Sequence, residues 1–96
     1  MKANKFIFNV GHNNKTKECE TGKIRAIMDS NKIQGYSIIK CMGVWQCNQE
    51  DSVIIEAINT PESPINEEKA QEIRGILKQQ LNQEAVLLSR QSIDLL

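Results

Sequence analysis

The chain has few of the residue types on which metal, redox and nucleic-acid sites are commonly built. It contains one histidine, one tryptophan, one tyrosine, two phenylalanines and two prolines among 96 residues. Its three cysteines, Cys19, Cys41 and Cys47, form an odd set without CxxC spacing. Such a set disfavours both a disulfide framework and a zinc site. We therefore expect reduced thiols, no bound metal and no cofactor.

Long apolar runs are also lacking. No stretch approaches the roughly 20 apolar residues that span a bilayer. The apolar stretch near the N-terminus ends after a few residues, and no small-residue cleavage site of a signal peptide follows it. We therefore expect a cytoplasmic protein without a membrane partner.

Net charge is zero, but the charges are unevenly distributed. Residues 1–48 carry eight Lys or Arg and three Asp or Glu, a net charge of +5, whereas residues 49–96 carry four and nine, a net of −5. A basic half is typical of nucleic-acid-binding proteins, but the acidic half is expected to fold against it here. An RNA-recognition domain would also expose aromatic side chains on its first and third strands, and SVIIEAI (residues 52–58) has none. We expect no DNA or RNA partner.

The hydrophobic content of 40% and charged content of 25% are those of an ordinary globular protein, and the length predicts one domain over residues 1–96. Hydrophobic periodicity and turn residues predict six elements. Ser63, followed by Pro64, is the predicted start of the second helix. The predicted elements are strand 5–11, helix 21–30, strands 36–45 and 52–58, helix 63–82 and strand 84–90.

This order is β-α-β-β-α-β, which predicts a ferredoxin-like α+β fold. Its four-stranded antiparallel sheet has the spatial order 4-1-3-2, with both helices on one face. In the first strand, Phe6, Phe8 and Val10 alternate with Ile7 and Asn9, so the former should face the core. The open face would be partly apolar, which favours a homodimer or higher homo-oligomer with ligand pockets between subunits.

The stretch GVWQCNQEDS, residues 43–52, carries more functional groups than a hairpin loop usually does. In the predicted topology it meets two distant segments at one sheet edge, GHNNKTK (11–17) and LNQEA (81–85). The N-terminus of the first helix opens there too and offers free N–H groups to an anion. We therefore predict a small polar site at this edge. Its predicted ligand-binding residues are Asn9, His12, Asn13, Asn14, Lys15, Trp45, Gln46 and Gln83.

Each of these features also has a purely structural interpretation. His12 is more often found in a solvated or capping role than in ligand contact, and Trp45 more often as a lid over the end of the core than as a stacking platform. Adjacent Glu50 and Asp51 are typical of a solvated turn. Glu84, with Gln83, suits a role in holding its corner of the chain.

Taken whole, the segments KFIFNVG, GVWQCNQEDSVIIE and LNQEAVLL resemble those of small phage and mobile-element proteins of largely uncharacterised function. Cys47 stands where that pattern has glycine. Some proteins of this kind suppress bacterial immunity by sequestering or cleaving a nucleotide second messenger. The resemblance implies a similar role here.

Three functions remain open from the sequence. The first is sequestration of a small anionic nucleotide-like ligand without catalysis, with Lys15 taking its charge and Trp45 stacking on its base. We favour it because one histidine and scattered acids fall short of a catalytic constellation. The second is a metal-independent hydrolase or lyase that cleaves a cyclic nucleotide through His12 and an acidic partner, Glu50 or Glu84. The third is a protein–protein inhibitor of a host enzyme.

Overall fold

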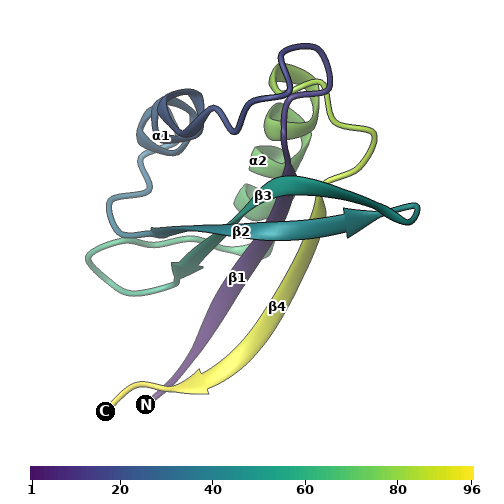
Figure 1. Cartoon of the computed structure of the whole chain (residues 1–96). Helices are drawn as coiled ribbons and strands as arrows, with labels where there is room; N and C mark the ends of the chain where they lie inside the picture. The colour runs from purple at the N-terminus through teal and green to yellow at the C-terminus, as the bar shows by residue number, and fades with distance from the viewer.

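A computed structural model describes residues 1–96 and contains six elements in the predicted order. The sheet has the order β2-β3-β1-β4 with every neighbouring pair antiparallel, and both helices lie on one face (Figure 1). The predicted ferredoxin-like fold and its strand order are confirmed. The elements are β1 (Lys2–Gly11), α1 (Thr21–Ser30), β2 (Ser37–Trp45), β3 (Asn48–Ile58), α2 (Glu67–Gln80) and β4 (Leu87–Asp94).

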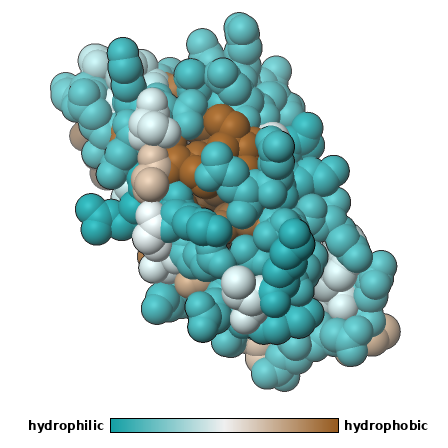
Figure 2. Space-filling model, turned by 90° about the horizontal axis from the view of Figure 1, so that it is seen from above, coloured by the Kyte–Doolittle hydropathy of each residue, from teal (hydrophilic) through white to brown (hydrophobic).

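The core lies between the helices and alternate residues of the two central strands. Phe8 of β1 lies opposite Ile55 of β3, and Val10 lies opposite Val53, all with almost no exposed surface. Burial of each such side chain is worth roughly 1.5–3 kcal/mol. Seen from above, apolar side chains show mainly in one central recess within a hydrophilic surface (Figure 2). The helices complete the core with Ile24, Ile27, Met28, Ala70, Ile73 and Leu77.

Helix α2 begins later than predicted. Its N-cap is Asn66, whose side chain accepts a hydrogen bond of 2.8 Å from the Lys69 N–H. The predicted cap, Ser63, is buried instead, and its Oγ accepts hydrogen bonds from the backbone N–H groups of Gln34 (3.1 Å) and Gly35 (2.8 Å). The prediction was wrong because the segment between α1 and β2 needs an acceptor, which the local sequence around Ser63 does not reveal.

Strands β1, β3 and β4 depart from their predicted bounds, whereas β2 agrees with its prediction to within one residue. Strand β4 begins at Leu87 and continues through the tail to Asp94, which pairs with Lys2 at the start of β1. An ion pair of 3.0 Å joins Lys2 Nζ to Asp94 Oδ1. Polar residues in both β1 and β4 hide the apolar–polar alternation by which a strand is recognised. The extension of the two strands was therefore not predicted from the sequence.

The stretch 43–52 is strand almost throughout, because only Gln46 and Cys47 lie between β2 and β3. Both have positive φ angles, 51° and 66°, as in a two-residue type I′ turn, which favours glycine at its second position. Side chains therefore alternate up to the tip. Trp45 lies opposite Asn48, and Gly43 opposite Glu50, on the same face of the hairpin.

The face of the sheet away from the helices is mixed in character. Ile7 lies opposite Glu56, and Asn9 opposite Ile54, as their alternation with core residues requires. Lys5 forms an ion pair of 3.5 Å with Glu56 there. The homo-oligomer expected to cover this face stays a prediction.

Neither α1 nor α2 has the length and apolar character of a membrane-spanning helix.

Replacing Ser63 by alanine should destabilise the fold by about 1–3 kcal/mol, because two backbone N–H groups near a buried site lose their acceptor. Urea unfolding followed by circular dichroism measures the change. Ser89→Ala, at an exposed position of β4, is the matched control and should change stability little. Equal effects of the two substitutions would contradict a structural role for Ser63.

Candidate functional site

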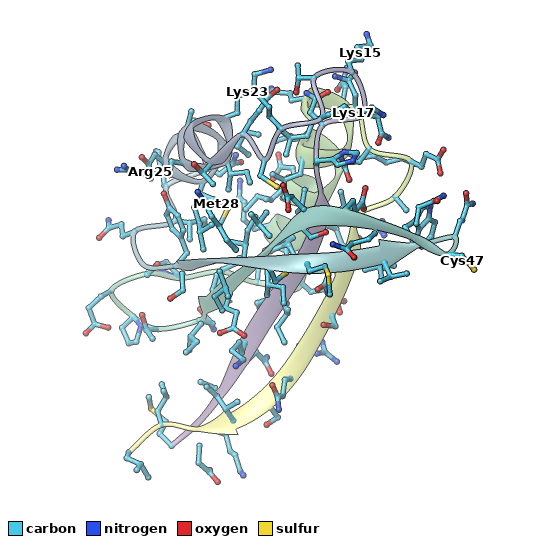
Figure 3. The ribbon with its side chains drawn as sticks, in the orientation of Figure 1. Lys15, Lys17, Lys23, Arg25, Met28 and Cys47 are labelled. Carbon is cyan, nitrogen blue, oxygen red and sulfur yellow. The ribbon has the colours of Figure 1, made fainter.

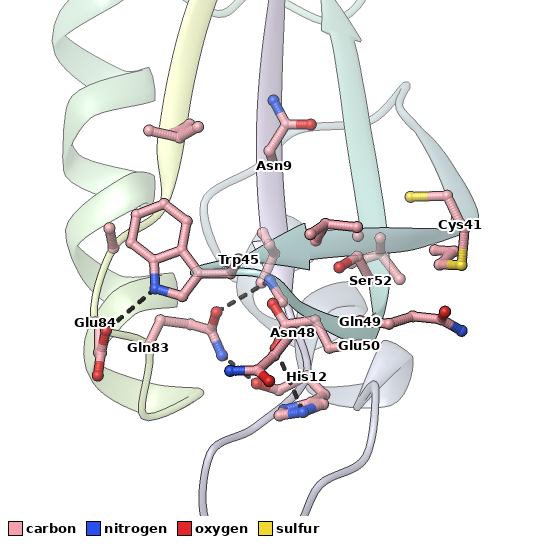
Figure 4. A pocket seen from close by; sticks show the side chains of 18 of the residues that line it. Asn9, His12, Cys41, Trp45, Asn48, Gln49, Glu50, Ser52, Gln83 and Glu84 are labelled. Carbon is pink, nitrogen blue, oxygen red and sulfur yellow. Dashed lines mark hydrogen bonds and ion pairs between the residues drawn. The ribbon is translucent and has the colours of Figure 1, made fainter.

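Three segments distant in sequence enclose a pocket of about 570 Å³, within the usual range of roughly 300–1,000 Å³ for ligand sites. The predicted convergence at one sheet edge is therefore seen in the structure (Figure 4). The polar lining comes from the end of β1 and its following loop, the β2–β3 hairpin and the α2–β4 corner. It comprises Asn9, His12, Asn14, Lys17, Gln46, Asn48, Gln49, Glu50, Ser52, Gln83 and Glu84.

His12 and Glu50 meet on the wall of this pocket. His12 Nε2 lies 3.3 Å from Glu50 Oε2, and the two side chains are only 18% and 22% exposed. The other ring nitrogen, His12 Nδ1, is buried without a hydrogen-bond partner. Of the two acidic partners predicted for His12, the structure brings Glu50 into contact.

Glycine makes room for these groups. A Cβ on Gly11 would lie 2.5 Å from Glu50 Oε1 and 3.0 Å from Gln83 Oε1. A Cβ on Gly43, opposite Glu50 in the hairpin, would collide with Ser52 Oγ. The pocket wall around Glu50 and Ser52 therefore depends on two missing side chains. Neither glycine nor Ser52 was among the predicted site residues, since no local pattern in the sequence reveals a close approach across strands.

Gln83 joins the α2–β4 corner to the end of β1. Its Oε1 accepts a hydrogen bond of 3.0 Å from the Gly11 N–H, and its Nε2 donates to the carbonyl of His12. The same Nε2 lies 3.2 Å from the carbonyl of Leu81. The Gln83 amide is thus engaged with backbone, so it holds the pocket wall whether or not it also binds a ligand.

Trp45 is not a lid over the core. Its residue surface is 46% exposed, and its indole N–H donates to Glu84 Oε2 at 3.3 Å (Figure 4). The hydrogen bond anchors the edge of the ring against the α2–β4 corner. The exposure of Trp45 excludes the core lid, which was one of the two interpretations open from the sequence. Stacking on a ligand, the other interpretation, stays a prediction.

Asn13 and Lys15 lie outside the pocket lining. Asn13 is buried, and its Oδ1 accepts hydrogen bonds from the Lys15 N–H (2.9 Å) and Asn82 Nδ2 (3.2 Å). Its Nδ2 donates to Glu20 at 3.0 Å. Lys15 lies at the far end of the loop, away from the hairpin tip (Figure 3). Lys17, which was not among the predicted ligand-binding residues, lines the pocket in its place.

The start of α1 is not a free anion site. Its N-cap is Glu20, whose side chain makes no capping hydrogen bond. Lys23 lies 2.9 Å from the Glu20 carboxylate and, with hydrogen bonds from Thr16 and Asn13, holds the pKa of Glu20 below its usual range. The negative charge is therefore present at neutral pH, and its stabilisation of the loop is lost as pH falls through this lowered pKa. A carboxylate here disfavours a second anion.

Of the three cysteines, only Cys41 lines the pocket. Cys47 is exposed at the hairpin tip (Figure 3) and does not line the pocket. Burial, and next the nearby Asp51 carboxylate, raise the pKa of the Cys19 thiol, so it is protonated at neutral pH. No three His, Cys, Asp or Glu side chains are grouped as metal ligands would be.

No family model and no curated protein matches the sequence. The fold, however, is shared by solved structures of two kinds, one enzymatic and one regulatory. The first is a phage SAM lyase in complex with S-methyl-5′-thioadenosine, 19% identical, with a TM-score of 0.73 over 97% of this chain and 90% of that one. Its apo state gives a TM-score of 0.69 over 95% and 81%.

The second kind is CPII, a nitrogen regulatory PII-like protein from Thiomonas intermedia K12. The structure bound to ADP, AMP and acetate is 16% identical, with a TM-score of 0.58 over 98% of this chain and 88% of that one. At these identities the likeness establishes a common fold. The resemblance to phage proteins is supported to the extent that a phage protein has this fold.

One expectation has to be corrected. We favoured a protein without catalytic activity because its histidine and acids looked too sparse. A lyase with the same fold over nearly the whole chain contradicts that preference. The preference assumed general acid–base chemistry, whereas a reaction with a good leaving group needs fewer catalytic side chains.

Trp45→Ala should lower the free energy of unfolding by about 1 kcal/mol or less, because Trp45 lies outside the core. Phe8→Ala is the comparison and should cost about 3–5 kcal/mol, as aromatic truncations in cores do. Urea unfolding of both variants measures the difference. A loss for Trp45→Ala as large as that for Phe8→Ala would contradict its placement as a pocket residue.

Proposed function

We propose that this chain is a lyase that cleaves S-adenosylmethionine, or a closely similar adenosyl sulfonium, and releases S-methyl-5′-thioadenosine. The observation that carries the proposal is the charge of the pocket, which presents the carboxylates of Glu50 and Glu84 against one lysine, Lys17. A half-open pocket of this kind suits a ligand with positive charge. The anionic ligand favoured by the sequence analysis suits it less well.

The ligands of the similar structures support the adenosyl part of this proposal. One holds S-methyl-5′-thioadenosine and the other ADP and AMP, so all three molecules contain adenosine. They differ at the 5′ end, where one carries a neutral thioether and the others phosphates. In this chain the exposed indole of Trp45 offers a surface for the base, since aromatic rings stack on bases with roughly 1–3 kcal/mol each. For a phosphate group, including that of a cyclic nucleotide, the pocket offers Lys17 as its one lysine or arginine.

The proposed cleavage requires few catalytic side chains. A sulfonium leaves as a neutral thioether, so no general acid is required. The substrate's own carboxylate attacks the methionyl γ-carbon, an oxygen–carbon bond forms, and the electron pair of the carbon–sulfur bond passes to sulfur. The products are a lactone and S-methyl-5′-thioadenosine, with no water, metal or oxidant consumed.

This step neutralises two opposite charges, so a poorly hydrated site accelerates it. Trp45, Leu87 and Ile54 supply apolar lining, while Glu50 lies at the polar end beside His12. We assign to Glu50 the ammonium group of the substrate. Held there, the substrate would place its sulfonium along the apolar wall, where the loss of charge is favoured. The roles of His12, Trp45 and Glu50 in binding are part of this proposal.

Incubation of the purified protein with S-adenosylmethionine should release S-methyl-5′-thioadenosine, detected by liquid chromatography and mass spectrometry. Glu50→Gln should lower kcat/KM by about 100-fold, since it removes a charge that holds the substrate. Glu62→Gln, in the exposed turn before α2, is the matched control and should retain activity. Absence of product from folded wild-type protein would reject the proposal.

The charge of the ligand gives a separate test by calorimetry. S-adenosylmethionine should bind roughly tenfold more tightly than S-methyl-5′-thioadenosine, which lacks the ammonium group assigned to Glu50, because a charged contact adds about 1.5 kcal/mol. Glu50→Gln should reduce this preference, and AMP should bind more weakly than either. Tighter binding of AMP would indicate an anion-binding pocket instead.

A further inference from the structure

We infer that Gln83 is a positioning residue, which fixes the end of β1 so that His12 holds the Glu50 carboxylate in the pocket; its effect on catalysis rests on the proposed function. Gln83 reaches the pocket wall from a corner more than 70 residues away in sequence. It touches the backbone of Gly11, the last residue of β1, and of His12, the first residue of the following loop. Gln83 therefore affects the pocket indirectly, by fixing the positions of His12 and Glu50.

The sheet leaves the end of β1 without a partner on one side. Pairing between β1 and β4 ends at Asn9 and Leu87, whereas pairing between β1 and β3 continues to Gly11 and Ser52. The side-chain amide of Gln83 takes the missing place, with Oε1 on the Gly11 N–H and Nε2 on the His12 carbonyl. One amide thus supplies both the acceptor and the donor that another strand residue would have supplied.

The imidazole of His12 has few other restraints. Its Nδ1 has no partner, and Nε2 meets only Glu50, 3.3 Å away. Its orientation therefore depends on the backbone of residue 12, which Gln83 holds. The ionisable groups lining the same pocket are Glu50 from β3, Glu84 from the α2–β4 corner, and Lys17 and Cys41, and none but Glu50 forms an ion pair with His12.

Glu50 and Gln83 both lie against Gly11. The space of the absent Gly11 Cβ is approached by Glu50 Oε1 and by Gln83 Oε1. The amide and the carboxylate thus lie against the same backbone position, so a shift of that backbone moves both. Removal of Gln83 should release the end of β1 and let His12 turn away from Glu50.

The single histidine allows a test that needs no substrate. His12 gives the only imidazole signals in a proton NMR spectrum, so the effect of Glu50→Gln on them can be measured at one fixed pH. We expect a clear shift in the wild-type background and a much smaller one in Gln83→Met, which keeps side-chain length but has no hydrogen-bonding groups. An equal shift in both backgrounds would overturn the inference.

Activity provides the second arm. Gln83→Met should lower kcat/KM for S-adenosylmethionine roughly 10- to 100-fold, because a displaced Glu50 carboxylate no longer holds the substrate in the reactive position. Gln80→Ala, an exposed glutamine on α2, is the control and should match wild type. Circular dichroism establishes that each variant is folded, and Gln83→Glu, which keeps only the acceptor for the Gly11 N–H, replaces Gln83→Met if that variant unfolds.

The two arms separate the two proposals. Inactive wild-type protein with the NMR coupling lost in Gln83→Met would reject the lyase and leave the positioning of His12 intact. Active wild-type protein with Gln83→Met as active as Gln80→Ala would reject the positioning role and leave the lyase intact.

Discussion

The structure depends on the register of β1 between its two neighbours. Because side chains alternate along a strand, the register that buries Phe8 and Val10 also turns Asn9 and Gly11 to the opposite face. A slip of one residue would place Asn9 in the core and remove the glycine from its position beside Glu50. The hydrophobic core and the pocket are therefore both fixed by the register between β1 and β3.

Polar side chains have a second structural task in this small domain, which is to bind backbone groups that the helices and strands leave unpaired. Gln83 does so for the end of β1, Asn13 for its own loop and Ser63 for the segment before β2. Buried N–H and C=O groups without partners are costly. Polar residues that resemble ligand contacts in the sequence are therefore partly committed to the fold.

The charges of the pocket link the fold to the proposed chemistry. Glu20 already occupies the region at the start of α1 with a negative charge, so that helix end does not favour an anion. Glu50 and Glu84 add negative charge at the pocket itself. Solved structures with this fold hold ADP and AMP in one protein and S-methyl-5′-thioadenosine in another. The cationic adenosyl ligand proposed for this chain rests on the charges of its own pocket side chains.

The sequence by itself determined the order of the elements and the buried face of β1, because hydrophobic periodicity is a local property of the chain. It also determined the strand order of the sheet, because the order of the elements and the right-handedness of crossovers leave one default topology. It also predicted which three segments would meet. Only the tertiary structure decided which side chains face the pocket there. Asn13 turned inward, Lys17 rather than Lys15 reached the pocket, and Glu50 settled against Gly11. These outcomes depend on contacts across strands and between distant loops, which no local pattern in the sequence encodes.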